Sequence, residues 1–160
     1  MSPFRLFSKK HSIKNPVVYP GFHQVKRVCV LYEQNLNPEL EEKVSSFFRQ
    51  HNKEFVLLKW GLKGNSKSAY LTPSDIFFGR IKKITFAESW NTDYDLVLDI
   101  SANTHKKILK LLQGRTDAVV CGIQQEHSEV YSFFVPVKNS QFGKSIDTLL
   151  QYLQTLNQET

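Results

Sequence analysis

A series of short, largely apolar runs constrains the fold of this chain most strongly. They lie at Val28–Leu31, Phe55–Leu58, Leu96–Ile100 and 118–123. Runs of this length, bounded by polar residues, are typical of strands that are covered on both faces. Helical patterns separate several of them, and alternation of strand and helix predicts a parallel sheet. We therefore expect an α/β fold: a three-layer, Rossmann-like single domain with a mixed, mostly parallel sheet.

Local signals place the helices. Asn37 as N-cap and Pro38 at the first helical position predict a helix that runs to about His51. Further amphipathic patterns predict helices over 104–113 and 145–156. Thr72 with Asp75 resembles a capping arrangement, and residues 84–86 read as a short strand.

The segment Val130–Val137 is rich in Phe, Tyr and Val, which favours a further strand. Its connection to the preceding strand is short, whereas a parallel return usually needs a dozen or more residues. The spacing therefore predicts antiparallel pairing. Pro136 indicates an edge position, because proline donates no hydrogen bond to a neighbouring strand.

The positive charge is concentrated at the start of the chain. The 160 residues carry 21 Lys and Arg against 15 Asp and Glu, a formal charge of +6. Residues 1–30 hold six of these cations and no acid, so the remaining residues are balanced at 15 of each sign. With prolines and a turn-like Pro20–Gly21 pair, this composition predicts a basic N-terminal arm over 1–24 and a single α/β domain over 25–160.

The arm is the feature that could bind an anionic partner. Its cations are Arg5, Lys9, Lys10 and Lys14. Nucleic acid or a ribonucleoprotein surface is favoured over a membrane, because the apolar residues of the arm are too few for a stable anchor. We therefore expect a non-catalytic accessory or binding protein. A basic tail that only aids solubility remains an alternative.

A second hypothesis concerns the carboxyl ends of the parallel strands, where α/β sheets usually bind ligands. Asp99, Ser101, Asn103 and Thr104 follow the strand Leu96–Ile100. They could receive a small anionic ligand such as a phosphosugar or a nucleotide. In the simpler alternative, Asn103 or Thr104 only caps the following helix.

Motifs that would fix a reaction are missing. The chain has neither G-x-G-x-x-G after its first strand nor a P-loop, and its histidines and cysteines lack metal-ligand spacing. We therefore predict no cofactor, no metal and no catalytic residue. Cys29 and Cys121 lie in apolar runs, which favours packing as free thiols. No stretch is long and apolar enough for a membrane span, so we expect a cytoplasmic protein and leave its oligomeric state open.

Two resemblances accompany these patterns. The basic start, the strands at 26–32, 95–99 and 116–123, and the amphipathic end together resemble a family of small bacterial proteins known only as a domain of unknown function. This resemblance implies no activity. The segment Tyr94–Asp99 with its Leu-rich helix is similar to the N-terminal half of heptosyltransferase-like glycosyltransferases. Those enzymes bind the nucleotide sugar with a second Rossmann-like half, for which this chain offers no counterpart. The likeness therefore implies at most a degenerate form of one glycosyltransferase half.

Overall fold

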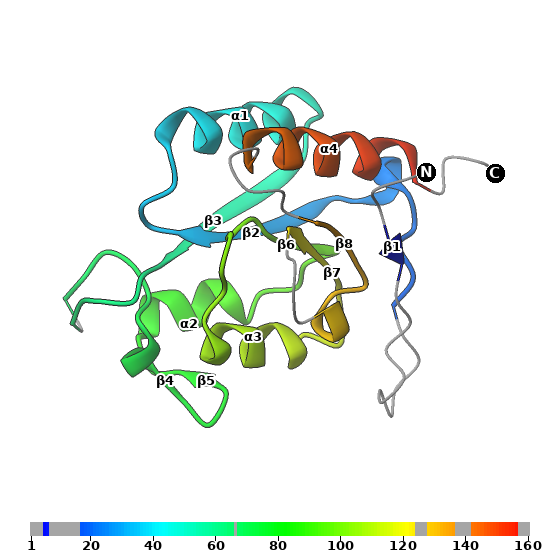
Figure 1. The fold of residues 1–160 in the computed structure, drawn as a ribbon. Helices are drawn as coiled ribbons and strands as arrows, with labels where there is room; N and C mark the ends of the chain where they lie inside the picture. Colours follow the sequence, from blue (N-terminus) through cyan, green and yellow to red (C-terminus); the bar gives the residue numbers. More distant parts are fainter. Residues whose placement is uncertain (1–4, 7–16, 66, 124–127, 137–141, 157–160) are drawn as a thin grey trace.

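A six-stranded sheet forms the centre of the computed structural model, which describes residues 5–6, 17–65, 67–123, 128–136 and 142–156 (Figure 1). The strand order is β1-β8-β7-β6-β2-β3. Five of these strands are parallel to one another, and β1 is antiparallel to β8. The bounds are Arg5–Leu6 for β1, Arg27–Glu33 for β2, Glu54–Trp60 for β3, Leu96–Asp99 for β6, Val119–Ile123 for β7 and Phe133–Val135 for β8.

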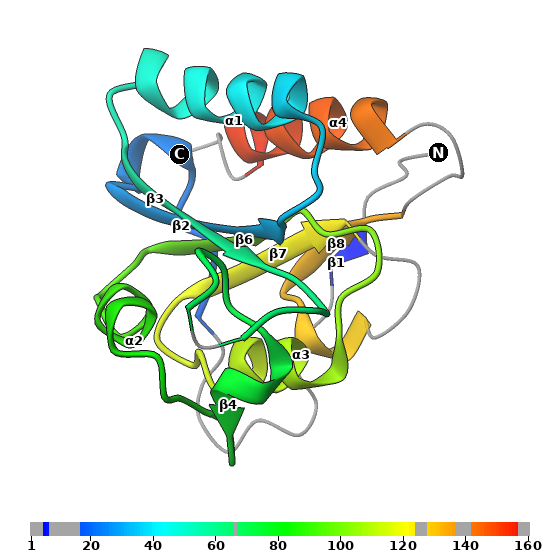
Figure 2. The same cartoon turned by 90° about the vertical axis from the view of Figure 1, so that its left-hand side faces the viewer.

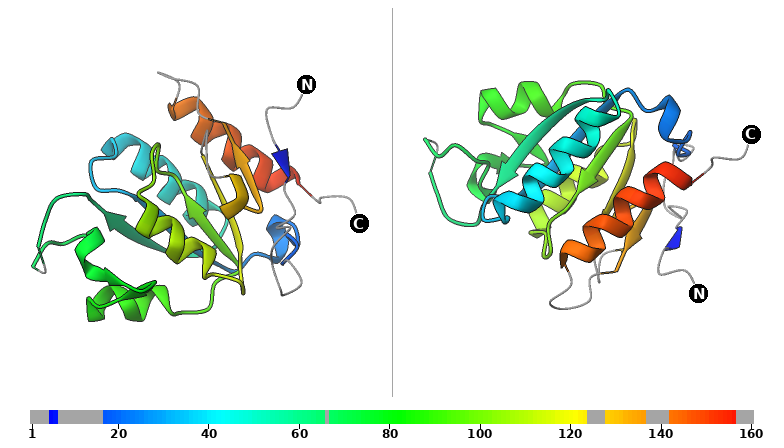
Figure 3. Two further views of the ribbon diagram at one scale, coloured as in Figure 1. Left: turned by 60° about the horizontal axis from the view of Figure 1, so that its bottom comes forward. Right: turned by 90° about the horizontal axis from the view of Figure 1, so that it is seen from above.

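Helices cover both faces of the sheet, which confirms the predicted three-layer α/β architecture. One layer holds α1 (Pro38–Gln50) and α4 (Phe142–Thr155), and the other holds α2 (Ile84–Trp90) and α3 (Lys106–Gln113) (Figures 1 and 2). Seen from above, α1 and α4 lie side by side over the sheet (Figure 3). None of the helices in the described part of the chain is long and apolar enough to cross a membrane.

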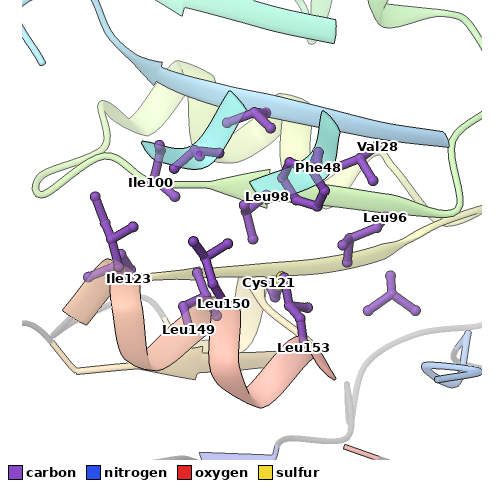
Figure 4. Close-up of a cluster of buried hydrophobic side chains, with 14 of the residues drawn as sticks. Val28, Phe48, Leu96, Leu98, Ile100, Cys121, Ile123, Leu149, Leu150 and Leu153 are labelled. Carbon is purple, nitrogen blue, oxygen red and sulfur yellow. The ribbon is translucent and has the colours of Figure 1, made fainter. Parts of the chain in front are cut away.

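Each face of the sheet has its own apolar core. The larger cluster packs Phe48 of α1 and Leu149 of α4 against β2, β6 and β7 (Figure 4). The second cluster packs α3 and Trp60 against the opposite face. Cys29 belongs to the second cluster and Cys121 to the first, and both are buried free thiols. Because alternate residues of a strand point to opposite faces, the sheet separates the two sulfur atoms.

The N-terminus of α1 confirms the local prediction. The Asn37 side-chain oxygen accepts a hydrogen bond from the Glu39 backbone N–H at 2.8 Å, and Pro38 occupies the first helical position. The prediction for α3 was wrong in its detail. Neither Asn103 nor Thr104 caps this helix; instead His105 Nδ1 accepts from the Lys107 backbone N–H at 3.1 Å. Thr104 is engaged elsewhere, as described below.

The prediction for the last strand was wrong in direction and position. β8 runs parallel to β7, with Cys121 opposite Phe133, and lies between β7 and β1. The connecting segment is short, yet it holds a 3-10 helix, η3 (Ser128–Val130). Val130 and Tyr131 pack into the second core cluster, so this segment makes a compact crossover on the α3 side. The antiparallel strand of the mixed sheet is β1 at the other end of the chain.

A small hairpin lies between β3 and β6. The Thr72–Asp75 capping box begins a 3-10 helix, η2 (Pro73–Asp75), followed by β4 (Ile76–Phe77) and β5 (Arg80–Ile81). These two strands pair antiparallel outside the main sheet and project below it in Figures 1 and 2. Residues 84–86, predicted as a strand, form the start of helix α2 instead.

The structure also describes part of the segment expected to form the arm. Tyr19 and Phe22 are buried in the larger core cluster, and Lys53 Nζ donates to the Phe22 carbonyl oxygen at 2.7 Å. The Tyr19 hydroxyl donates to the Leu153 carbonyl oxygen of α4. The segment 17–24, which precedes β2 in the sequence, is therefore attached to the domain through Tyr19 and Phe22.

Candidate functional site

The strand order reverses between β2 and β6, at the place where α/β sheets usually bind ligands. From β2 the chain crosses through α1 to β3 on one side, and later returns to β6 on the other side. The carboxyl ends of β2 and β6 lie together, with Leu31 opposite Asp99. The structure thus places the predicted residue Asp99 at this switch point.

Asp99 is fully buried there and is surrounded by hydrogen-bond donors. Its Oδ2 accepts from the Tyr131 hydroxyl and from Thr104 Oγ1, both at 2.7 Å. Its Oδ1 accepts from the Ser101 backbone N–H at 3.0 Å. Two of the other three predicted ligand-binding positions, Ser101 and Thr104, therefore donate to Asp99 itself.

A tryptophan extends this arrangement to the next strand. Trp60, fully buried at the end of β3, donates from Nε1 to Ser101 Oγ at 2.8 Å. We call Asp99, Ser101, Thr104, Tyr131 and Trp60 the switch-point network. It joins the end of β3, the residues at and after the end of β6, and Tyr131, two residues before β8.

Sequence reasoning missed Tyr131 as a partner of Asp99, although one signal was available. Gly122 interrupts the apolar strand β7, and glycine inside a strand often marks the close approach of another group. A Cβ atom at Gly122 would lie 2.7 Å from the Tyr131 ring and 2.9 Å from the Asp99 carbonyl oxygen. Glycine is therefore required at this position for the tyrosine to reach the carboxylate.

Burial dominates the electrostatics of this edge. It raises the pKa of Asp99, against the opposing effect of the hydrogen bonds from Tyr131, Thr104 and Ser101. Burial also raises the pKa of Glu33 at the end of β2, and the Asp99 carboxylate acts in the same direction. Two carboxyl groups at one edge disfavour an anionic ligand between them.

The other polar side chains near this edge, those of Asn103, His105 and Lys107, have separate roles and do not form one site. Asn103 is exposed, whereas Thr104 is buried. Lys107 donates from Nζ to the carbonyl oxygens of Pro73 and Ile76 at 3.1 and 3.4 Å, so it holds the base of the hairpin. His105 has a lowered pKa because of its burial and the adjacent lysines, which suits a neutral ring that accepts the capping bond.

A groove of about 400 Å³ lies elsewhere, between α1 and α4. The ion pair between Lys43 and Asp147, at 2.8 Å, lies in its wall. Glutamine side chains and the partly buried ring of Phe47 line the rest. Within the described residues, no group of three or more His, Cys, Asp or Glu side chains could hold a metal ion.

The β4–β5 hairpin presents the most exposed aromatic surface of the described residues. The Phe77 side chain is 54% exposed and that of Phe78 is 90% exposed. The rings meet edge to face, with centroids 4.4 Å apart. Lys82 Nζ lies 4.2 Å from the Phe77 ring centroid, and Arg80 is exposed beside it. We call Phe77, Phe78, Gly79, Arg80 and Lys82 the hairpin tip.

The base of the hairpin, in contrast, is firmly held. Asp75 Oδ2 accepts from the Thr72 backbone N–H at 2.8 Å and lies 3.2 Å from Lys83 Nζ, with both charged side chains largely buried. Burial acts to raise the pKa of Asp75, but the bonds from Thr72 and the charge of Lys83 outweigh it and lower the pKa. Ile76 anchors the first strand in the second core cluster.

The predicted cations of the arm are only partly described. Arg5 lies in β1, where its backbone pairs with that of Phe134 in β8. Lys9, Lys10 and Lys14 lie outside the described residues. The structure therefore shows where the arm meets the sheet.

Comparison with known proteins identifies a family whose function is unknown. No curated protein matches the chain. The similarity of Tyr94–Asp99 to glycosyltransferases gains no support from the comparison. Residues 5–156 match the model of a family of unknown function. The matched range contains all the helices and strands described above. The predicted relationship is thus confirmed, and the chain belongs to the family of unknown function DUF6913.

Proposed function

We propose that this protein is a non-catalytic accessory factor that binds nucleic acid, alone or on a ribonucleoprotein surface, through its basic N-terminal arm. The observation that carries the proposal is the charge distribution. Residues 1–30 contain six Lys and Arg and no acid, while the rest of the chain is balanced. Unneutralised cations on one segment release counterions from a phosphate backbone when they bind it.

The attachment of the arm supports this function. The backbone of β1 pairs with β8 at one edge of the sheet, and Tyr19 and Phe22 enter the core. Residues 7–16, which hold three lysines, therefore join two points on the domain. The residues that flank the three lysines in the sequence are therefore both held by the domain.

The usual ligand position of the fold supports a small-molecule function less well. Ser101, Thr104 and Tyr131 donate to Asp99, which is fully buried. A phosphosugar or nucleotide would have to break these bonds before it could use the same atoms. These bonds therefore favour binding through the arm over a small anionic ligand held by Asp99, Ser101, Asn103 and Thr104.

We further propose a cytoplasmic location. Cys29 and Cys121 are both buried as free thiols on opposite faces of the sheet. Burial raises the pKa of the Cys29 thiol to about 12 and that of Cys121 well above its ordinary value. Such thiols are unreactive core residues, as is common in proteins of a reducing compartment.

The test compares variants of the full-length chain. Removing residues 1–24 would also remove the core residues Tyr19 and Phe22, so charge neutralisation is the cleaner change. The triple variant K9Q/K10Q/K14Q is compared with K106Q/K110Q/K144Q, which removes equal charge from exposed positions of the domain. Binding to a labelled single-stranded oligonucleotide is measured by fluorescence anisotropy over a range of salt concentrations.

The proposal predicts that wild-type binding weakens steeply with salt. Each lost phosphate contact lowers the slope of log K against log salt by about 0.7 for single strands, so the arm variant should lose about 2 units of slope. The domain variant should retain most of the slope. Salt-independent binding, or equal effects of the two variants, would contradict the proposal and leave the arm as a solubilising tail.

A further inference from the structure

We propose that the hairpin tip is a stacking platform for the bases of single-stranded nucleic acid. The inference rests on the proposed nucleic-acid function and adds a second contact site, far from the arm in sequence and formed by folded residues. In this site the Phe78 ring stacks on a base, and Arg80 and Lys82 bind the neighbouring phosphates. Aromatic rings beside cations are the usual elements of single-strand binding surfaces.

The backbone of the tip is the first argument. Phe78 and Gly79 form a two-residue turn, and both have positive φ, at 51° and 74°. Positive φ at both central positions is the pattern of a type I′ turn, which favours Asn-Gly or Asp-Gly. A bulky aromatic residue is unfavourable at the first position. The sequence thus keeps a strained phenylalanine where a polar residue would fit better.

The exposure of the ring is the second argument. Phe78 is 90% exposed, so the strained conformation brings no burial of the ring within the domain. Its neighbour Phe77 meets it in a T-shaped arrangement, which leaves most of the Phe78 ring open to solvent. An open aromatic face is what a nucleobase needs for stacking, and this stacking tolerates any base.

The charge around the tip is the third argument. Residues 59–83 contain six Lys and Arg and a single acid, Asp75. That carboxylate is buried and already paired with Lys83, so it does not neutralise the tip. Arg80 and Lys82 are exposed and take part in none of the ion pairs of the described residues. The balanced total charge of the domain therefore conceals a local cationic surface.

The position of Lys82 favours a nucleic acid over a membrane or a protein. Its ammonium lies 4.2 Å from the Phe77 ring centroid, at the level of the aromatic pair. Inserting the rings into a bilayer would carry this charge towards the hydrocarbon, which is unfavourable. Lysine is also depleted in the centres of protein interfaces. Beside a stacked base, however, the same ammonium is within reach of a phosphate.

The base of the hairpin gives the platform a fixed direction. Lys83 contacts Asp75 and donates to the carbonyl oxygens of Ser68 and Tyr70, while Lys107 donates to Pro73 and Ile76. The tip thus projects from a base tied to two neighbouring segments. Rigid presentation reduces the entropy lost when a ligand binds.

Substitution of Phe78 by asparagine tests the site, because asparagine is favoured in this turn and lacks the ring. The matched control is Leu62→Asn, which removes a side chain that is 60% exposed in the loop after β3. Both full-length variants and K82Q are titrated with a labelled deoxythymidine single strand of about 16 nucleotides, the upper end of common site sizes. A duplex of the same length and anionic phospholipid vesicles serve as competing probes.

The proposal predicts that F78N binds the single strand about 5- to 140-fold more weakly, the loss of one stacked base, with an unchanged salt slope. L62N should bind within twofold of wild type, and K82Q should lose about 0.7 units of slope. Duplex binding should be equal in F78N and wild type. Unchanged single-strand binding by F78N would overturn the platform and leave the arm proposal intact. Wild-type binding to vesicles and to neither nucleic acid would overturn both proposals.

Discussion

The switch-point network and the hairpin tip use polar and aromatic residues in opposite ways. In the network, the polar atoms of Asp99, Thr104 and Tyr131 are buried and hydrogen-bonded to one another. At the tip, Phe78 is exposed and its backbone is strained. The first arrangement stabilises the fold at the place where α/β proteins usually bind ligands. The second lowers the stability of the fold, which is the arrangement expected where a residue is kept for binding.

This difference shows why a fold alone does not locate a function. The strand order places the switch point where a Rossmann-like sheet would hold a nucleotide. Here, however, the side chains of Trp60 and Tyr131 occupy that edge together with Asp99. We propose that a partner binds instead to elements added to the sheet, namely the arm and the β4–β5 hairpin. The following substitutions test this contrast.

Asp99→Ala should have the largest effect on stability. It removes the carboxylate that accepts three buried hydrogen bonds, from the Tyr131 and Thr104 hydroxyls and from the Ser101 N–H. We expect the free energy of unfolding in urea to fall by about 3 kcal/mol or more. Asp93→Asn, at an exposed position, is the control and should change it little. A folded Asp99→Ala variant of wild-type stability would show that the network is not structural.

Asp75→Asn should have a pH-dependent effect on the base of the hairpin. The pKa of Asp75 is lowered in the folded protein, so the stability it contributes is fully present above the ordinary pKa of about 4 and is lost as pH falls through the folded pKa. We expect a loss of about 2 kcal/mol at neutral pH that shrinks in acid. Asp147→Asn removes an exposed ion pair with Lys43 and should have little effect. A constant difference between D75N and wild type would contradict this assignment.

Tyr131→Phe should have a smaller effect, because it removes one hydroxyl and keeps the ring beside Gly122. Losing the donor to Asp99 should lower the free energy of unfolding by about 1 kcal/mol. It should also raise the pKa of Asp99 further, since that hydrogen bond favours the charged form. Nuclear magnetic resonance of the carboxyl carbon measures this pKa. A pKa identical to that of the wild type would mean that the bond does not stabilise the carboxylate.

Phe78→Asn should have the smallest effect on stability, and in the opposite direction. Relief of the left-handed conformation should raise the free energy of unfolding by up to about 1 kcal/mol. Chemical denaturation of the free protein checks this value. A clear loss of stability would mean that the ring packs against the domain and is not held for a partner.

Local signals in the sequence predicted much of the fold. The cap at Asn37 and the apolar runs of β2, β3, β6 and β7 depend on neighbouring residues, and each is confirmed. The direction of β8 was not accessible in this way, because it depends on how Val130 and Tyr131 pack across the sheet. The pairing of β1 with β8 joins opposite ends of the chain. Contacts of this kind leave no periodic pattern.

The candidate sites show the same limit. The sequence placed Asp99, Ser101 and Thr104 together at one edge, and the structure agrees about their position. The hydrogen bond that closes this network comes from Tyr131, which lies 32 positions after Asp99. The hairpin tip escaped prediction because Phe-Phe-Gly-Arg lacks the Asn-Gly signal of a tight turn. That mismatch between sequence and turn type becomes visible only when the backbone angles are known.

The central claim is that Phe78 at the hairpin tip serves binding rather than stability. It is tested most directly by thermal unfolding of F78N and wild type, each with and without the deoxythymidine single strand. A ligand that binds only the folded state raises the melting temperature. We predict that free F78N melts at or above the temperature of wild type, and that the oligonucleotide raises its melting temperature less. If free F78N melts well below wild type and gains an equal shift from the oligonucleotide, the hairpin tip supports the fold and not the binding of a partner.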